Sequence, residues 1–265
     1  MCDQIKKPLL DVLFMSDKRK TVLLLLQDGP KEMESLLKSL DTNRPTLLPQ
    51  MRVLEESHLI VHYNDSYELT TLGKIVIDKM LPLLDTLEVF DVDIDYWGAH
   101  DLRFAPGSLL CRLREIKDCK VIEPNVVNIY EINKDFIETC TISKDLLFIL
   151  TFVHPIFTTL ISQFIANNSN VKVIINMDLL QKFKANRPKE VKGYINSEKV
   201  RFYLYQKEMN LGTFAQNDHC SVLRLLSKDN TYDYTQLFCK GSDALKWGKE
   251  LFDIYLKDSI PITEI

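Results

Sequence analysis

Short polar side chains between residues 42 and 66 have the chemistry needed to contact the edges and backbone of a DNA duplex. Asn and Gln can read adenine through two hydrogen bonds, and a basic side chain adds positive charge. The residues expected to contact DNA are Thr42, Asn43, Arg44, Thr46, Gln50, Arg52, Asn64 and Ser66. The first six lie in the segment 42–57, and the last two belong to a short turn that follows it.

The segment 42–57 is predicted to be a helix whose two sides differ in polarity. Its apolar side carries Leu47, Leu48, Met51 and Leu54, and the opposite arc carries Asn43, Thr46, Gln50 and Arg52. Thr42 is expected to cap the first turn, and Pro45 lies where a missing N–H costs little. Pro49 lies deeper and is expected to kink or loosen the helix. Such a helix fits a major groove about 12 Å wide.

The elements around this helix are expected to present it to a duplex. Apolar spacing predicts helices over 18–29 and 31–40, the first ending at a Gly-Pro pair. Two β-rich runs within 59–70 flank turn residues and predict a hairpin, and 71–90 returns to helical spacing. The order helix, helix, tight turn, helix, hairpin, helix predicts a winged helix-turn-helix domain over residues 1–80.

The segment 16–75 resembles the ArsR-type winged-helix regulators of prokaryotes. The matching elements are Pro45-Thr46, Val53-Leu54-Glu55-Glu56, Leu59-Ile60, Tyr67-Glu68-Leu69-Thr70 and Gly73. Three departures are visible. The helix 42–57 has no Cys, so the metal-sensing motif of some members is absent, and Ser57-His58 replaces the usual Gly before the hairpin. Pro49 stands where many members have a polar contact residue.

The whole chain resembles a group of regulators from methanogenic archaea. Those proteins join such a head to a domain named for the middle part of a methanogenesis regulatory protein. The stretch 82–102 and the ending 245–265 carry this resemblance. It implies transcriptional control, a homodimer, and a C-terminal sensor domain with an α/β fold distantly similar to phospholipase D halves.

The second half of the chain has the pattern of an α/β domain. Short β-rich runs alternate with helical ones, and several strands crowd together between 200 and 240. This pattern predicts a mixed sheet buried on both faces. We expect three parts: a DNA-binding domain at 1–80, a connecting and dimerisation segment at 81–112, and a sensor domain at 113–265.

The same region lacks the motifs that catalysis would need. The sequence contains no phosphate-binding glycine motif and no nucleophile elbow. A phospholipase D site needs a Lys two residues after a His, and neither His154 nor His219 supplies it. We therefore expect no catalytic residue. The least favoured alternative is a phospholipase D-like hydrolase.

The second half of the chain is expected to bind a ligand in a pocket. Ligands of α/β sheets bind at the carboxyl ends of the strands, where His154 and Asp178 are expected to lie. Tyr96 and Trp97 would add aromatic walls, so the candidate ligand-binding residues are Tyr96, Trp97, His154 and Asp178. The simpler interpretation is that His154 and Asp178 cap helices. Trp247 is expected to lie in the core.

Composition limits the possible partners and compartments. The chain has 265 residues, a formal net charge of −4 and six cysteines without metal-ligand spacing. We expect reduced thiols, no metal, no cofactor, no membrane partner and a cytoplasmic location. Residues 1–80 hold eleven Lys and Arg against twelve Asp and Glu. DNA binding thus requires a local positive face, and a winged-helix protein-interaction module without DNA binding is the alternative.

Overall fold

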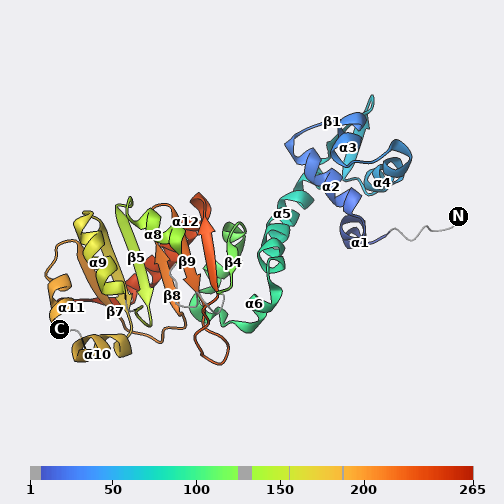
Figure 1. The fold of residues 1–265 in the computed structure, drawn as a ribbon. Coiled ribbons are helices and arrows are strands. Elements are labelled where there is room, and N and C mark those ends of the chain that lie inside the picture. The colour runs from blue at the N-terminus through green and yellow to red at the C-terminus, as the bar shows by residue number, and fades with distance from the viewer. Residues whose placement is uncertain (1–6, 125–132, 155, 187, 265) are drawn as a thin grey trace. The chain divides into compact units, whose positions relative to one another are not determined.

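The computed structural model describes residues 7–124, 133–154, 156–186 and 188–264. The chain divides into two compact units, Met1–Leu84 and Asp85–Ile265, drawn as ribbons in Figure 1. Each unit has its own hydrophobic core. Among the described residues, no helix combines the length and the apolar character that crossing a membrane requires.

The first unit consists of short helices and a small antiparallel sheet. Its elements in chain order are α1 (Leu9–Phe14), α2 (Asp17–Leu25), the 3-10 turn η1 (Leu26–Asp28), β1 (Lys31–Glu32), α3 (Met33–Ser39), α4 (Arg44–Glu56), β2 (Ile60–Tyr63), β3 (Ser66–Leu69) and the start of α5 (Thr71–Asp91). The sheet has the strand order β1-β3-β2. The helices α2, α3 and α4, the β2–β3 hairpin and α5 follow in the expected order, whereas α1 and β1 were not expected.

Local sequence explains how α4 begins and how it continues. Asn43, and not Thr42 as expected, is the N-cap, because its side chain accepts a hydrogen bond from the Thr46 N–H. Pro45 occupies the first turn, where no N–H is needed. The helix runs on through Pro49 to Glu56 without a break.

Three backbone positions fix the hairpin and the start of α5. Asn64 and Asp65 have φ values of 50° and 69°, which is the left-handed conformation that a tight two-residue hairpin turn requires. Gly73 lies so close to the carbonyl of Leu59 that an added Cβ would collide with its oxygen. A glycine at 73 therefore lets α5 approach the strand that follows α4.

The second unit is built on a large mixed sheet. Its helices are the end of α5, α6 (Ile94–Ala99), η2 (Leu102–Phe104), α7 (Gly107–Leu110), η3 (Leu113–Ile116), α8 (Lys134–Cys140), α9 (Phe157–Ala166), α10 (Met177–Asn186), α11 (Pro188–Ile195) and α12 (Ser242–Lys257). Its strands are β4 (Lys120–Ile122), β5 (Asp145–Leu150), β6 (Asn170–Ile175), β7 (Val200–Tyr205), β8 (Thr213–Gln216), β9 (Cys220–Arg224), β10 (Gln236–Lys240) and β11 (Ser259–Ile262).

The strand order among the described residues is β11-β7-β6-β5-β8-β9-β10-β4. Strands β5, β6 and β7 are parallel, and the other pairs are antiparallel. The expected mixed sheet is therefore confirmed. The sequence pattern of 127–140 predicts a helix, which is found at Lys134–Cys140, whereas 127–132 lie outside the described residues.

Successive side chains of each strand point to opposite faces of the sheet, so the second unit has two hydrophobic cores. In β5, Leu147 and Ile149 pack with Trp247 of α12 on one face. Leu146, Phe148 and Leu150 pack with α8 to α11 on the other. Helices thus cover both faces of the sheet (Figure 1), and Trp247 lies in the core as expected.

The connecting and dimerisation segment expected at 81–112 contains the end of α5 followed by α6, η2 and α7. Helix α5 runs unbroken from Thr71 to Asp91, across the point where the two units meet in sequence. From Asp85 onward the chain is part of the second unit, and Tyr96, Phe104 and Leu109 lie in its core.

One pair of cysteines corrects the expectation of reduced thiols. Cys119 and Cys239 form a disulfide although 120 residues separate them in sequence. Strands β4 and β10 pair so that Lys120 stands opposite Phe238, which brings the two cysteines side by side. Among the described cysteines, Cys111 is exposed, and Cys140 and Cys220 are buried free thiols.

Candidate functional site

The side chain of Asn43 caps the start of α4 by accepting two hydrogen bonds from Thr46. The Oδ1 of Asn43 accepts from the Thr46 N–H at 3.0 Å and from the Thr46 hydroxyl at 2.7 Å. Both side chains are exposed. Because Oδ1 is engaged, the Nδ2 group of Asn43 is the part of this amide left to donate to an external acceptor. Thr42, just before the cap, is half-buried.

An ion pair joins the start of α4 to the turn of the hairpin. Arg44 pairs with the carboxylate of Asp65, and the backbone carbonyl of Asp65 accepts from the Met33 N–H at 3.0 Å. The turn is thereby held against both α3 and α4. Asn64 is exposed at this turn, and Ser66 begins β3 opposite Tyr63. The hairpin residues and the start of α4 therefore lie on one continuous surface.

Gln50 is placed differently from the expected polar arc. It is half-buried, and its Oε1 accepts from Arg19 Nη1 at 2.7 Å and from the Ser16 hydroxyl at 3.2 Å. Arg19 is itself buried and donates to the backbone carbonyls of Asp11 and Val12. The carbonyl oxygen of Gln50 thus belongs to the junction of α1, α2 and α4.

The basic side chains of the first unit differ in their availability. Arg52 is exposed and makes no hydrogen bond or ion pair with any residue that the structure describes. Arg44 is half-exposed but shares its charge with Asp65, and Lys20 pairs with Asp17. Arg19 is buried and contributes nothing to the surface.

The four candidate ligand residues of the second unit do not form one site. Tyr96 and Trp97 are buried in the core on the α12 face, where the indole N–H donates to the Val89 carbonyl at 2.9 Å. His154 lines an apolar hollow on the opposite face, and Asp178 lines a separate polar one. The expected aromatic walls are therefore core residues.

Neither His154 nor Asp178 is the N-cap of a helix, because Ile156 is the N-cap of α9 without a side-chain cap hydrogen bond and Asn176 caps α10. The His154 Nδ1 accepts from the Ile156 N–H at 3.3 Å, and its carbonyl accepts from the Phe157 N–H at 2.9 Å. At the start of α10, Asn176 supplies the capping oxygen to the Leu179 N–H at 3.0 Å. Asp178 follows it and is exposed.

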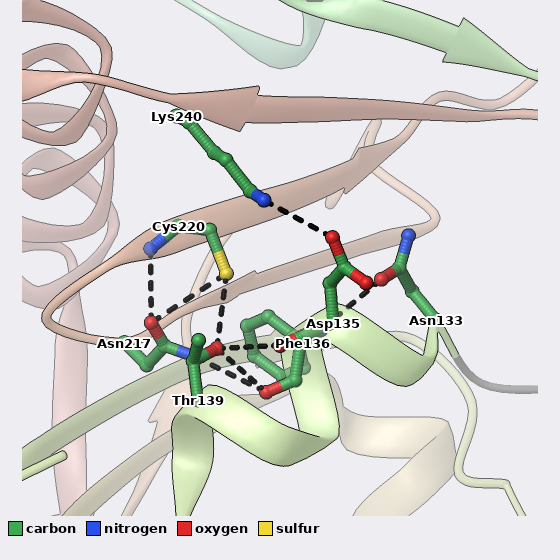
Figure 2. Close-up of polar contacts among 7 residues, drawn as sticks. All are labelled: Asn133, Asp135, Phe136, Thr139, Asn217, Cys220 and Lys240. Carbon is green, nitrogen blue, oxygen red and sulfur yellow. Dashed lines mark hydrogen bonds and ion pairs between the residues drawn. The ribbon is translucent and has the colours of Figure 1, made fainter. Parts of the chain in front are cut away.

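A polar cluster that the sequence did not reveal fastens α8 to the sheet (Figure 2). The Nδ2 of Asn217 donates to the Phe136 carbonyl at 3.2 Å and to the Thr139 hydroxyl at 2.8 Å, while its Oδ1 accepts from the Cys220 N–H at 2.9 Å. Asp135 pairs with Lys240 of β10 at 3.0 Å. These contacts fix α8, which forms a wall of the apolar hollow.

Burial is the main cause of the pKa shifts of three ionisable groups in the second unit. Burial raises the pKa of the Cys140 thiol to about 12 and also raises the pKa of Cys220. Burial likewise raises the pKa of Tyr232, an effect that neighbouring Arg224 opposes. The described residues contain no group of three or more His, Cys, Asp or Glu side chains placed to hold a metal.

Both units match domains of one class of regulatory protein. Residues 7–88 match the family model for the N-terminal domain of methanogenesis regulatory protein FilR1. Residues 129–258 match the family model for its middle domain. The chain is also similar to a whole protein, the methanogenesis regulatory protein FilR1 of Methanothrix harundinacea (strain 6Ac). The two are 25% identical over 270 residues, which cover 99% of this chain. The chain spans 59% of the length of that relative.

Two solved structures show weaker similarity. TrmBL2, described as an archaeal chromatin protein with a novel mode of DNA binding, is 16% identical, with a TM-score of 0.43 over 95% of this chain and 97% of its own. The dimethyltransferase RosA from Streptomyces davawensis is 12% identical, with a TM-score of 0.26 over 74% of this chain and 62% of its own. Neither similarity assigns a fold or a function.

Proposed function

We propose that this chain is a transcriptional regulator that binds double-stranded DNA through its first unit. In this proposal residues 7–84 form a winged helix-turn-helix of ArsR type, with α4 as the recognition helix and β2–β3 as the wing. The observation that carries it is the shared surface of α4 and the hairpin turn, joined by Arg44 and Asp65. The matches to two FilR1 domains support a regulatory role.

The structure refines which side chains are suited to each contact. Arg52, Asn43 and Thr46 are exposed on α4, and Asn64 is exposed on the hairpin turn. Arg52 is suited to a phosphate, and the amide groups are suited to base edges or backbone. We assign Gln50 to positioning α4, because its carbonyl oxygen is engaged by Arg19.

We also propose that the protein acts in the cytoplasm as a homodimer through α5. Four exposed apolar side chains, Leu72, Ile75, Leu83 and Leu87, are found along this helix. At 100° per residue they fall within roughly a third of its circumference. An apolar stripe of this kind is suited to the same stripe on a second copy. Paired recognition helices then meet half-sites about 34 Å apart.

The second unit is proposed to sense an effector and to shift the population of DNA-competent dimers. A ligand can do this only if it binds the two states with different affinity. The name of FilR1 suggests methanogenesis genes as targets. Since the chain spans only part of that relative, its targets are also a proposal.

Binding to the DNA upstream of its own gene tests the proposal. The full chain should bind with an affinity that falls steeply as salt rises, because released counterions drive association. Arg52→Ala should weaken binding and reduce the salt slope by about 1. Arg201→Ala, at an exposed position of β7, is the matched control and should change neither. Absence of binding at low salt, or a flat salt response, would refute DNA binding and favour a protein-interaction module.

A further inference from the structure

The second unit contains an apolar hollow of about 80 Å³ on the face of the sheet covered by α8 and α9. Five phenylalanines contribute to its walls: Phe136, Phe148, Phe152, Phe157 and Phe164. At about 10–15 Å³ per water-sized position, this space holds roughly five to eight non-hydrogen atoms. It is too small for a nucleotide and suited to a short chain or a single ring.

Arg224 interrupts this apolar lining at the end of β9. In register, Arg224 stands opposite Thr213 of β8, and Thr213 stands opposite Leu150 at the end of β5. Alternation places Arg224 on the same face as Val222, two residues before it, which belongs to this apolar core. A charged side chain therefore lines the hollow at the carboxyl end of parallel strand β5, where α/β proteins bind ligands.

The guanidinium of Arg224 has neutral neighbours and an unfilled donor. Its Nη1 donates to the Tyr232 hydroxyl at 3.2 Å and its Nη2 to the Gln236 Oε1 at 3.3 Å. Its Nε is buried and has no hydrogen-bond partner among the described residues. No Asp or Glu of the described chain pairs with Arg224 or lines the hollow.

Among the described residues, no negatively charged side chain balances the guanidinium of Arg224 in the hollow. Arginine remains protonated in proteins, so its charge is not removed by titration. Leaving a buried donor of a charged group without a hydrogen-bond partner is energetically unfavourable. A carboxylate can accept two parallel hydrogen bonds from a guanidinium, the two-pronged geometry that such groups favour.

We propose that this hollow binds a small amphipathic carboxylate, with its apolar part among the phenylalanines and its carboxylate on Arg224. Inorganic phosphate would satisfy the charge but gain nothing from the walls. A neutral hydrocarbon would fit the apolar walls and leave the charge of Arg224 without a counter-ion. Only a molecule with an apolar part and a carboxylate can contact both the phenylalanines and Arg224. The inference deepens the sensing role within the proposed function, and rests on it only for the link to DNA.

Calorimetric titration of the full chain with hexanoate tests the proposal. Hexanoate should bind at least tenfold more tightly than hexanamide or hexan-1-ol, and acetate and inorganic phosphate should not bind. Arg224→Gln should remove the preference for hexanoate over hexanamide, and Arg224→Lys should retain part of it. Arg201→Gln, on the exposed side of β7, should leave binding unchanged.

Two further measurements keep the test decisive. Ala215→Leu should fill the hollow and abolish hexanoate binding without changing any charge, with near-ultraviolet circular dichroism confirming an intact core. If Arg224→Gln does not fold, the comparison of hexanoate with hexanamide on the unmodified chain still decides. Equal binding of these two, retained preference in Arg224→Gln, or no binding of hexanoate up to about 10 mM would overturn the proposal.

These measurements are independent of DNA. If the chain fails to bind its upstream DNA but binds hexanoate through Arg224, the ligand inference stands and the regulatory proposal falls. If DNA binds and hexanoate does not, the reverse holds.

Discussion

The Nη1 of Arg19 donates a hydrogen bond of 2.7 Å to the Oε1 of Gln50, which ties α2 to the middle of the proposed recognition helix. Gln50 also accepts from Ser16 at the start of α2. A residue whose type suits base recognition is thus engaged in supporting the helix that carries it. This contact separates the roles of two neighbours on α4, Gln50 and Arg52.

Gln50→Ala is expected to destabilise the protein, because it leaves a buried guanidinium short of one acceptor. The loss in free energy of unfolding should be about 1–3 kcal/mol. Arg52→Ala removes an exposed side chain and should change stability by about 0.5 kcal/mol at most. Urea unfolding of the full chain followed by circular dichroism checks both. Equal stability of the two variants would contradict the role assigned to Gln50.

Asp65→Asn is expected to tighten DNA binding while keeping the hairpin. Asn tolerates the φ of 69° found at this position, so the turn should persist. Loss of the carboxylate releases Arg44 and removes a charge that repels phosphate. Since an exposed ion pair is worth about 0.2–1 kcal/mol, affinity should rise by about fivefold at most.

The matched control for this variant is Asp78→Asn on α5, which changes the net charge equally at a position paired with Lys79. Fluorescence anisotropy with labelled DNA at one salt concentration measures both. Weaker binding by Asp65→Asn than by the control would show that the ion pair itself is needed to present the surface.

Ile75→Glu is expected to convert the proposed dimer to a monomer. Ile75 is 58% exposed in one chain, so a carboxylate there should disrupt pairing and leave the fold of each chain intact. Lys74→Glu places the same side chain at the exposed position just before Ile75, which lies outside the apolar stripe. This variant should remain dimeric. Sedimentation equilibrium gives the mass. A monomeric unmodified chain, or a dimeric Ile75→Glu, would disprove this interface.

Cys119→Ser is expected to lower stability by about 2–4 kcal/mol, because the disulfide closes a long loop. The same loss should follow reduction of the unmodified chain and should be absent when Cys119→Ser is reduced. Cys111→Ser, at an exposed free thiol, should retain full stability. Thermal unfolding with and without dithiothreitol provides the comparison, and an unchanged midpoint in Cys119→Ser would show that the bond does not constrain the fold.

Stability should fall as pH rises above 9, and Cys140 should contribute to this fall. The folded state raises its thiol pKa from 9.0 to about 12, so the folded state holds the proton over a range in which the unfolded state releases it. The stabilisation is complete below pH 9 and is lost as pH rises toward 12. Each pH unit in this window changes the contribution by up to about 1.4 kcal/mol.

Cys140→Ala isolates that contribution, since tyrosines and Cys220 titrate in both proteins. The free energy of unfolding should depend less steeply on pH between 9 and 10 in the variant than in the unmodified chain. Identical slopes would mean that the Cys140 proton is released equally easily in both states.

The sequence predicted the local elements of the first unit well because their signals are local. Apolar spacing and turn residues place α3, α4 and the hairpin within a few residues of their observed bounds. The capping residue shifted by one position, from Thr42 to Asn43, because both side chains can cap a helix. The orientation of Gln50 was not predictable, since it depends on where α1 and α2 pack.

In the second unit, the strands were predictable and the partners of their side chains were not. β11 was missed because it is a short edge strand containing Pro261. Arg224 lies in an apolar run whose strand character is evident, but its missing counter-ion is a property of three dimensions. Tyr96 and Trp97 were expected at a pocket because aromatic residues serve both pockets and cores.

Arg19 is held by two backbone carbonyls and an amide rather than by an acid. Dissolved ions screen attraction between opposite charges, and this guanidinium is fixed by dipoles in a buried environment. The packing of α1 and α2 behind α4 should therefore be insensitive to ionic strength. A titration of DNA binding against potassium chloride would then measure the loss of phosphate contacts alone. The position of α4 would stay the same across the titration, because α1 and α2 would remain packed against it.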